Sequence, residues 1–391
     1  MSPPRPSWIR ARAPGGEQVA RLLELTRRQR LHTVCQGAHC PNLGECWGRG
    51  TATFLLLGPR CTRTCAFCAV AQGAPSPPDP GEPQRAARAT AALGLRHAVI
   101  TSVTRDDLPD GGAGHFAATV REIRRHHPGC SVEVLVPDFG GELESLRQVL
   151  AAAPEVLGHN LETVPRLYPL VRPQADYRRS LSLLACAARE GSGRVKSGLM
   201  VGLGESRQEV LAVLADLRRV GVSLVTVGQY LPPSARHLPV RRYWHPRELA
   251  SLERAALRLG FTAAACAPLV RSSYHADRML PSPVPPPTLV GAALSPPFPL
   301  MSGGAAGPAA PVWSAAVHRR FGMGLSPPAK GQAPGNPLGA PASRRLPSCR
   351  AGPPLSPALS PDVSPEALAK GEALAKGEAS AEGEPPSCSL P

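Results

Sequence analysis

Six of the 11 cysteines in this 391-residue chain form two triplets that lie only 15 residues apart. They are Cys35, Cys40 and Cys46, spaced C-x4-C-x5-C, and Cys61, Cys65 and Cys68, spaced C-x3-C-x2-C with Phe67 before the last thiol. Three thiolates can fill three corners of a [4Fe–4S] cluster, whereas an electron-transfer cluster normally takes four cysteines. The fourth iron then has no cysteine ligand, so it can coordinate a substrate, as the open position of a catalytic zinc site does.

Other uses of clustered cysteines fit this pattern less well. Zinc sites usually combine a C-x2-C pair with a matching distant pair, and no such second pair exists in this sequence. Disulfide frameworks are typical of short secreted domains, and this chain is long and carries no secretion signal. Buried packing explains lone cysteines such as Cys130, Cys186 and Cys266, but not six at such regular spacing.

The two triplets predict two clusters with different tasks. The C-x3-C-x2-C spacing with an aromatic residue before the last thiol is typical of enzymes that bind S-adenosylmethionine (SAM) at the open iron. Such enzymes cleave SAM reductively to make a radical. In the first triplet, Pro41 and Asn42 predict a turn between ligands. His39 and Glu45 are further candidate ligands there, although solvated or supporting roles fit them better.

Several further strings give the chain a specific resemblance. The two triplets resemble those of the lipoyl synthase family, and the similarity extends almost without a gap over residues 7–278. The strings that carry it are 101–112 (TSVTRDDLPDGG), 159–165 (HNLETVP), 196–205 (KSGLMVGLGE), 229–234 (QYLPPS) and 271–274 (RSSY). Departures are minor: Pro59 stands where an acidic residue is expected, and Ala267 where a glycine is expected.

The resemblance implies an activity and a set of ligands. Lipoyl synthases insert two sulfur atoms, at C6 and C8 of an octanoyl chain that is amide-linked to a lysine of a carrier domain. Cys61, Cys65 and Cys68 would hold the SAM-cleaving cluster, and the first triplet the auxiliary cluster that donates sulfur. The fourth auxiliary ligand is then Ser273, with Ser272 as the alternative. An alkoxide is a less natural iron ligand than a thiolate, so it should leave more readily.

Contacts to SAM are expected at the ends of three predicted strands. Gly202 and Glu205 follow one strand, in a glycine-rich turn that is also common in any α/β protein. Asn160 and Glu162 end another strand, where they could contact ribose or substrate. Arg105 could hold the amino-acid part of SAM, or it could simply pair with a neighbouring aspartate.

Short apolar runs alternate with amphipathic stretches of helical length, which is typical of parallel βα units. The predicted strands are 53–57, 97–103, 131–136, 155–160, 195–201 and 222–229, and the predicted helices are 82–94, 113–127, 142–152, 174–190, 205–220 and 246–259. Six such units favour an α/β fold of the radical SAM type, a partial (β/α)6 TIM-type barrel open on one side. A flat doubly wound sheet is the rival. The second triplet follows the first strand, at the end where barrel sites lie. Because the auxiliary triplet precedes that strand and Ser273 comes after the last helix, the two ends of the domain should meet over the barrel mouth.

Composition divides the chain into three parts. Residues 1–50 form an extension that carries the auxiliary-cluster cysteines, and residues 51–280 form the barrel with its RSSY segment. Residues 281–391 are rich in Pro, Ala, Ser and Gly, and too poor in aromatic and β-branched residues to form a core, so a disordered tail is expected there. Cys349 and Cys388, both in this tail, are expected to be free thiols.

The charge is strongly basic, at +15, and 40 of the 44 basic residues are arginine. An acidic partner is one interpretation, because lipoyl carrier domains are typically acidic around the target lysine. A nucleic-acid partner is the weaker one, since aromatics are scarce and no nucleic-acid-binding motif accompanies the arginines. A solvated basic surface without a dedicated partner is the third.

The implied partners are octanoylated carrier domains (a 2-oxoacid dehydrogenase E2 or a glycine cleavage H protein), a reductant such as ferredoxin or flavodoxin, and an iron–sulfur carrier that rebuilds the auxiliary cluster.

No segment approaches the length of a membrane helix, and thiols intended for clusters indicate a reducing, cytoplasmic location. Two other functions compete: a methylthiolating radical SAM enzyme acting on RNA, and a non-catalytic carrier of electrons with two clusters.

Overall fold

The computed structural model describes residues 2–11, 13–49 and 51–279. The expected tail at 281–391, with Cys349 and Cys388, lies outside the described residues. None of the helices in the described part is long and apolar enough to span a membrane. Cys130, Cys186 and Cys266 are buried, as packing cysteines should be.

An eight-stranded sheet forms the centre of the fold, with its strands in the order β1-β2-β5-β6-β7-β8-β9-β10. Only the pairing of β1 with β2 is antiparallel, and each later neighbour is parallel. The strands are β1 (His32–Thr33), β2 (Thr53–Leu56), β5 (His97–Ser102), β6 (Ser131–Leu135), β7 (Val156–Gly158), β8 (Arg194–Val201), β9 (Leu224–Gln229) and β10 (Ala263–Ala267); β3 (Arg60–Cys61) and β4 (Ala71–Gln72) form a separate pair.

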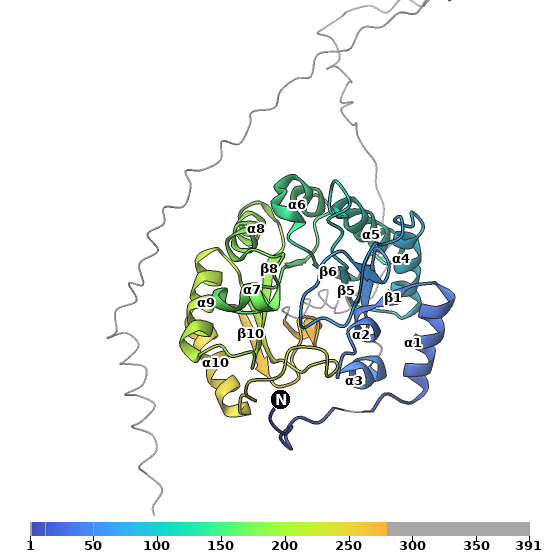
Figure 1. The fold of residues 1–391 in the computed structure, drawn as a ribbon. Helices are drawn as coiled ribbons and strands as arrows, with labels where there is room; N and C mark the ends of the chain where they lie inside the picture. Colours follow the sequence, from blue (N-terminus) through green and yellow to red (C-terminus); the bar gives the residue numbers. More distant parts are fainter. Residues whose placement is uncertain (1, 12, 50, 280–391) are drawn as a thin grey trace, which may run out of the picture. The chain divides into compact units, whose positions relative to one another are not determined.

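Helices follow the strands and lie around the outside of the sheet (Figure 1). The six predicted helices are present as α4 (Glu82–Ala92), α5 (Ala113–His126), α6 (Leu143–Leu150), α8 (Tyr177–Glu190), α9 (Arg207–Arg219) and α10 (Pro246–Arg258). Side chains that cap the first turns fix where the later helices begin. Ser206 and Glu209 form a reciprocal capping box at α9, and Asp176 accepts the amide of Arg179 at α8.

The sequential strand order decides between the two predicted folds. A doubly wound sheet reverses its strand order and carries helices on both faces, whereas a barrel adds each strand beside the previous one. From β2 to β10 the parallel strands follow the order of the chain, and the sheet is not closed by a pairing of β10 with β1. The partial barrel is therefore confirmed.

One parallel strand was not predicted. All six predicted strands are present, but β10 (Ala263–Ala267) adds a seventh to the parallel series. Its sequence, AAACA, has no β-branched residue, so propensity gives no signal for it. It pairs along its full length with β9, from Ala263 opposite Leu224 to Ala267 opposite Gly228. Tertiary pairing therefore makes this segment a strand.

The N-terminal part adds helices that the sequence reading did not predict. They are α1 (Glu17–Arg28), α2 (Val34–Gly37) and α3 (Leu43–Gly48). A small apolar cluster packs Val19 and Leu22 of α1 against Cys35 and Trp47. Shorter elements complete the described chain: α7 (Tyr168–Val171), η1 (Phe139–Gly141), η2 (Pro165–Leu167) and η3 (Ala276–Met279). The first cysteine triplet therefore lies on a packed helical layer beside β2.

Candidate functional site

A cavity of about 510 Å³ lies at the carboxyl ends of the barrel strands. The three cysteines of the C-x3-C-x2-C triplet line it, together with residues within β8 and residues that follow β5, β6, β7 and β9. Its lining includes Thr101, Leu135, His159, Asn160, Glu162, Met200, Tyr230 and Leu231. Active sites of barrels lie at this end, because the loops that follow the strands converge there.

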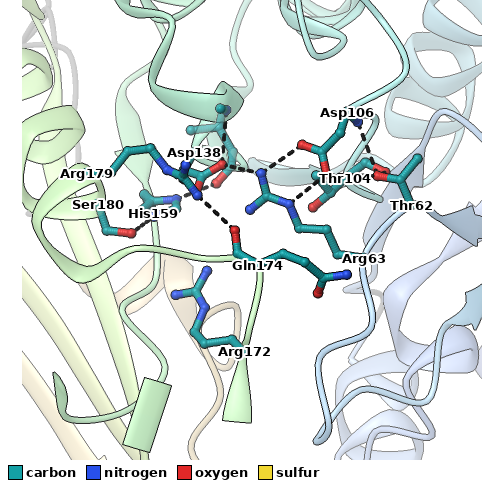
Figure 2. Close-up of polar contacts among 12 residues, drawn as sticks. Thr62, Arg63, Thr104, Asp106, Asp138, His159, Arg172, Gln174, Arg179 and Ser180 are labelled. Atoms are coloured by element: carbon teal, nitrogen blue, oxygen red, sulfur yellow. Dashed lines mark hydrogen bonds and ion pairs between the residues drawn. The ribbon is translucent and has the colours of Figure 1, made fainter. Parts of the chain in front are cut away.

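The loop that carries Cys61 and Cys65 is anchored by Arg63, which stands between them. Figure 2 shows the Arg63 guanidinium between two carboxylates, those of Asp106 and Asp138. It donates to each at 2.7 Å, and Arg179 contacts the second oxygen of Asp138 at 2.9 Å. Burial opposes ionisation of Asp138, but the hydrogen bond and charge of Arg63 lower its pKa to about 2. The arrangement fixes the cluster loop to the strands next to it.

Backbone hydrogen bonds hold the rest of this loop. The amide and hydroxyl of Thr64 donate to the Gln174 side chain, at 3.1 and 3.2 Å. The Ala66 amide donates to the carbonyl of Val171 at 2.9 Å. From the other side, Nε2 of His237 donates to the carbonyl of Cys68 at 3.2 Å. The positions of all three cysteines are thus set by the surrounding loops.

The thiols of this triplet fit an iron–sulfur cluster. Burial raises the pKa of Cys65, and burial also raises the pKa of Cys68 to about 11. Buried thiols such as Cys65 and Cys68 become thiolates together only beside a strongly positive centre, so metal binding must release their protons. Among the described residues no three His, Cys, Asp or Glu side chains converge tightly enough to ligate a single metal ion. A [4Fe–4S] cluster needs thiols spread around a cavity, and all three line the one described above.

The first triplet lines a second cavity, of about 430 Å³. Cys35, Cys40 and Cys46 all face it, and so does Ser273. Burial, together with the neighbouring thiols of Cys35 and Cys40, raises the pKa of Cys46 to about 12. Near this triplet lies Arg271. Burial lowers the pKa of its guanidinium, and the nearby Cys40 opposes that effect only in part. Three thiols and one hydroxyl around one cavity match the ligand count of a cluster.

Two long-range hydrogen bonds bring the RSSY segment to this triplet. The Asn42 side chain donates to the carbonyl of Leu269 at 2.6 Å, and the phenol of Tyr274 donates to Glu45 at 3.0 Å. The ends of the domain therefore meet, as the barrel topology predicted. Ser273 lines both cavities, whereas Ser272 lines only the larger one.

Two of the five predicted SAM contacts line the larger cavity, and they lie together. The Asn160 side chain donates to Glu162 at 2.9 Å and to the Ser272 hydroxyl at 2.6 Å. Burial raises the pKa of Glu162, and Arg172 opposes that effect. Glu162 also has a positive φ of 65°, which is uncommon for a residue with a side chain. Such backbone strain is often found at functional sites.

The other three predicted contacts lie away from the lining of both cavities. Both oxygens of Glu205 are used within its own turn, by the amides of Gly202 and Leu203, and one of them also accepts the indole N–H of Trp244. Gly202 has φ 105°, and a Cβ there would come within 2.1 Å of the Gln229 side chain. These two residues therefore shape the turn after β8.

Arg105 is similarly occupied. Its guanidinium donates to both oxygens of Asp107 at 2.9 Å and to the carbonyl of Leu57 at 3.2 Å. The structure therefore shows the pairing with a neighbouring aspartate, the second of the two roles considered for this residue.

Arg172 is a site residue that the sequence reading missed. It is buried, lines the larger cavity and lies close enough to Cys65 and Glu162 to affect the pKa of each. One of its nitrogens donates to the carbonyls of Asn160 and Leu161, while its Nε has no partner in the described part of the chain. A buried cation with spare donor capacity suits a carboxylate ligand. Among 40 arginines, no spacing distinguishes this one.

Comparisons with known proteins agree with this geometry. The model of the radical SAM superfamily matches residues 55–217, which span the cluster loop and the strands up to α9. The fold and the site thus define a radical SAM enzyme.

Sequence relatives are more specific. The lipoyl synthase of Rubrobacter xylanophilus is 54% identical over 273 residues, which cover 70% of this chain and 85% of that protein. The lipoyl synthase of Nitrosococcus oceani is 56% identical over 277 residues, with coverages of 70% and 85%. The chain belongs to the lipoyl synthase family. Among solved structures, HydG, a maturase of the [FeFe]-hydrogenase, is 15% identical, with a TM-score of 0.44 over 63% of this chain and 55% of that one.

Membership of the lipoyl synthase family defines the reaction that the chain catalyses. The enzyme is a sulfurtransferase that uses SAM and [4Fe–4S] clusters to insert two sulfur atoms, at C6 and C8 of a protein-bound octanoyl-lysine. The auxiliary cluster is the sulfur donor. The substrate is therefore an octanoylated carrier protein.

Proposed function

We propose that the two cavities divide this reaction between them. Cys61, Cys65 and Cys68 hold the SAM-cleaving cluster in the larger cavity. Cys35, Cys40 and Cys46, with Ser273 as fourth ligand, hold the auxiliary cluster in the smaller one. One observation carries the proposal: Ser273 lines both cavities, so the sulfur donor lies beside the space in which the radical is made.

When bound, a reduced [4Fe–4S] cluster and SAM supply a 5′-deoxyadenosyl radical that removes hydrogen from an unactivated carbon. The residues of the chain position the reactants and exclude competing groups. Arg172 binds the SAM carboxylate, since it is a buried cation that affects the pKa of Cys65 and has an unused donor. Asn160 and Glu162 accept hydrogen bonds from the amino or ribose groups. Leu55, Val70, Met200 and Leu231 provide an apolar surface for the octanoyl chain.

The Ser273 hydroxyl provides a ligand that can leave. A hard alkoxide binds iron less naturally than a thiolate does, so a cluster held by Ser273 would have one labile ligand position. Ser273 would therefore hold the auxiliary cluster in a form that can give up sulfur to the substrate. Ser272 has a different part in this proposal, because its hydroxyl already accepts the Asn160 amide.

The proposed division has a direct test. Anaerobic reconstitution with iron and isotopically labelled sulfide should give about eight irons per chain. Labelled sulfur should then appear in the lipoyl product. Cys61→Ala should abolish 5′-deoxyadenosine formation, whereas Cys46→Ala should retain it and lose sulfur insertion. Loss of 5′-deoxyadenosine in both variants, or unlabelled product from the labelled enzyme, would contradict the assignment.

The finer partners are part of the proposal. The carrier is a lipoyl domain of a 2-oxoacid dehydrogenase E2 or a glycine cleavage H protein. A ferredoxin or flavodoxin supplies electrons, and an iron–sulfur carrier rebuilds the auxiliary cluster.

We also propose three parts of the chain: residues 1–50 as the extension with the auxiliary-cluster cysteines, residues 51–280 as the barrel and residues 281–391 as the tail. A reducing cytoplasm suits the free thiols of the described residues.

A further inference from the structure

The substrate of this enzyme is an acyl chain attached to a folded protein, so a protein must rest where the cavity opens. Arg5 is exposed and also lines the larger cavity, which therefore reaches the surface at the N-terminal segment. Leu231, Pro232 and Pro233 line the same cavity. The surroundings of this opening decide which protein surface the enzyme can accept.

Two segments far apart in sequence form one continuous surface there. The amide of Val240 donates to the Ser2 hydroxyl at 3.0 Å, across 238 positions. The rings of Trp8 and His245 are in edge contact, with centroids 5.0 Å apart. Residues 2–8 therefore lie beside residues 240–245. We name residues 2–11 and 231–247 together the mouth surface.

The charge of the mouth surface has one sign. Residues 2–16 and 229–247 contain no aspartate or glutamate. The exposed arginines of the mouth surface that lack a carboxylate partner among the described residues are Arg5, Arg10, Arg236, Arg241 and Arg247. Only Arg242 is paired, with Glu248 at 3.1 Å. On the outer helices, by contrast, arginines such as Arg125 and Arg147 pair with glutamates of their own helix.

The mouth surface also presents an aromatic side chain. Trp8 is 42% exposed, which is unusual for so large an apolar side chain, and it stands among the arginines. Tryptophan and arginine are the residue types enriched where proteins bind each other most strongly. Pro3, Pro4 and Pro6 restrict the backbone before it, so little conformational freedom is lost on binding.

We infer that the mouth surface is the docking site for the folded carrier domain, through an acidic face around its octanoyl-lysine. This inference rests on the proposed function. The arginines steer an acidic face toward the opening, and Trp8 packs against the docked domain. The octanoyl chain then enters beside Arg5, while the body of the carrier stays on the surface.

The test compares two substrates of the reconstituted enzyme: a folded octanoylated lipoyl domain and a short octanoyl-lysyl peptide with an uncharged sequence. The double variant Arg236→Glu/Arg241→Glu should raise KM for the domain at least tenfold and leave peptide turnover within twofold. It should also remove most of the salt dependence of KM. The matched control is Arg88→Glu/Arg121→Glu, which makes the same change in charge at exposed positions on α4 and α5. It should leave KM for the domain within twofold.

Trp8→Ala gives an independent, charge-neutral readout, with an expected rise in domain KM of about fivefold. Equal effects of the two double variants, or equal losses with domain and peptide, would overturn the inference. So would binding of RNA fragments to the mouth surface together with no detectable binding of an acidic lipoyl domain. Failure of the wild-type enzyme to modify the peptide at all would instead count against the proposed function, so the two failures are distinguishable.

Discussion

The phenol of Tyr274 donates a hydrogen bond of 3.0 Å to the carboxylate of Glu45, which lies 229 positions earlier in the sequence. Nε2 of His275 approaches the same carboxylate oxygen at 3.2 Å. Glu45 adjoins Cys46, and Tyr274 adjoins Ser273. This one bond therefore fixes the spacing between a cysteine of the first triplet and the serine that is proposed to complete its cluster.

Tyr274→Phe should weaken the auxiliary cluster and spare the other one. The change removes one hydrogen bond to a partly exposed carboxylate, which is worth on the order of 1 kcal/mol. Iron should therefore be lost from the auxiliary cluster several-fold faster under chelation, as followed by Mössbauer spectroscopy. Tyr243→Phe, on the loop after β9, is the control and should behave as wild type. Equal loss of both clusters from Tyr274→Phe would contradict the assigned role.

The two serines of the RSSY segment should give opposite results. Ser273→Ala removes the proposed iron ligand, so sulfur insertion should fall at least 100-fold while 5′-deoxyadenosine still forms. Ser272→Ala removes the acceptor of the 2.6 Å bond from Asn160, so KM for SAM should rise several-fold while iron content stays near wild type. Product and 5′-deoxyadenosine are measured together by mass spectrometry. The reverse pattern would assign the ligand to Ser272.

His159 should make the stability depend on pH in a defined window. Its Nδ1 donates to the carbonyl of Val136 at 2.9 Å, so Nε2 is free to accept the Ser180 hydroxyl at 3.0 Å. Burial and the nearby Arg172 lower its pKa from 6.5 to about 4. Between these values the unfolded chain binds a proton that the folded protein does not, so stability falls as the pH drops from 6.5 toward 4. The total is about 3 kcal/mol.

His159→Gln should flatten this segment of the stability curve, because an amide can still donate to Val136 and does not titrate. Urea unfolding followed by circular dichroism at several pH values measures the slope. The exposed His32→Gln is the control and should leave the slope unchanged. An unchanged slope in His159→Gln would show that His159 is not the group responsible.

The limits of sequence reasoning about the fold are clearest at β10 (Ala263–Ala267). Apolar, β-branched runs predicted the other parallel strands, because buried strands in such sheets have that composition. An alanine-rich segment has no such signal, and only its pairing with β9 makes it a strand. The short helices before β2 were missed for a related reason, since their stability comes from packing around Trp47.

The residues of the site also fall into two groups: those that local sequence patterns predict, and those whose place depends on contacts between distant segments. Cysteine spacing is local, so the sequence could predict the two groups of thiols that line the cavities. Arg172 could not be predicted, because its place in the lining depends on segments that are far apart in the sequence. Gly202, Glu205 and Arg105 lie in motifs of the family, yet hydrogen bonds within their own loops occupy both charged side chains. A family motif predicts which segment lies near the site, but it does not predict the direction in which each side chain points.

Asp138→Asn tests whether the buried ion pair with Arg63 positions the cluster loop. Its carboxylate is fully buried and contacts Arg63 at 2.7 Å, while exposed Asp79 contacts Arg85 at the same distance. Because the folded-state pKa of Asp138 is lowered from 3.8 to about 2, its ionisation contributes roughly 2 kcal/mol of stability. That contribution is fully present above about pH 4 and is lost as the pH falls through 2.

At neutral pH, Asp138→Asn should therefore destabilise the protein by at least this amount, because it leaves Arg63 and Arg179 with less compensating charge. Iron should be lost selectively from the SAM-cleaving cluster, with the auxiliary cluster unchanged in its Mössbauer spectrum. Asp79→Asn is the matched control and should have little effect, since an exposed ion pair contributes little. Equal destabilisation by the two variants, or loss of the auxiliary cluster first, would show that Arg63 does not act through Asp138.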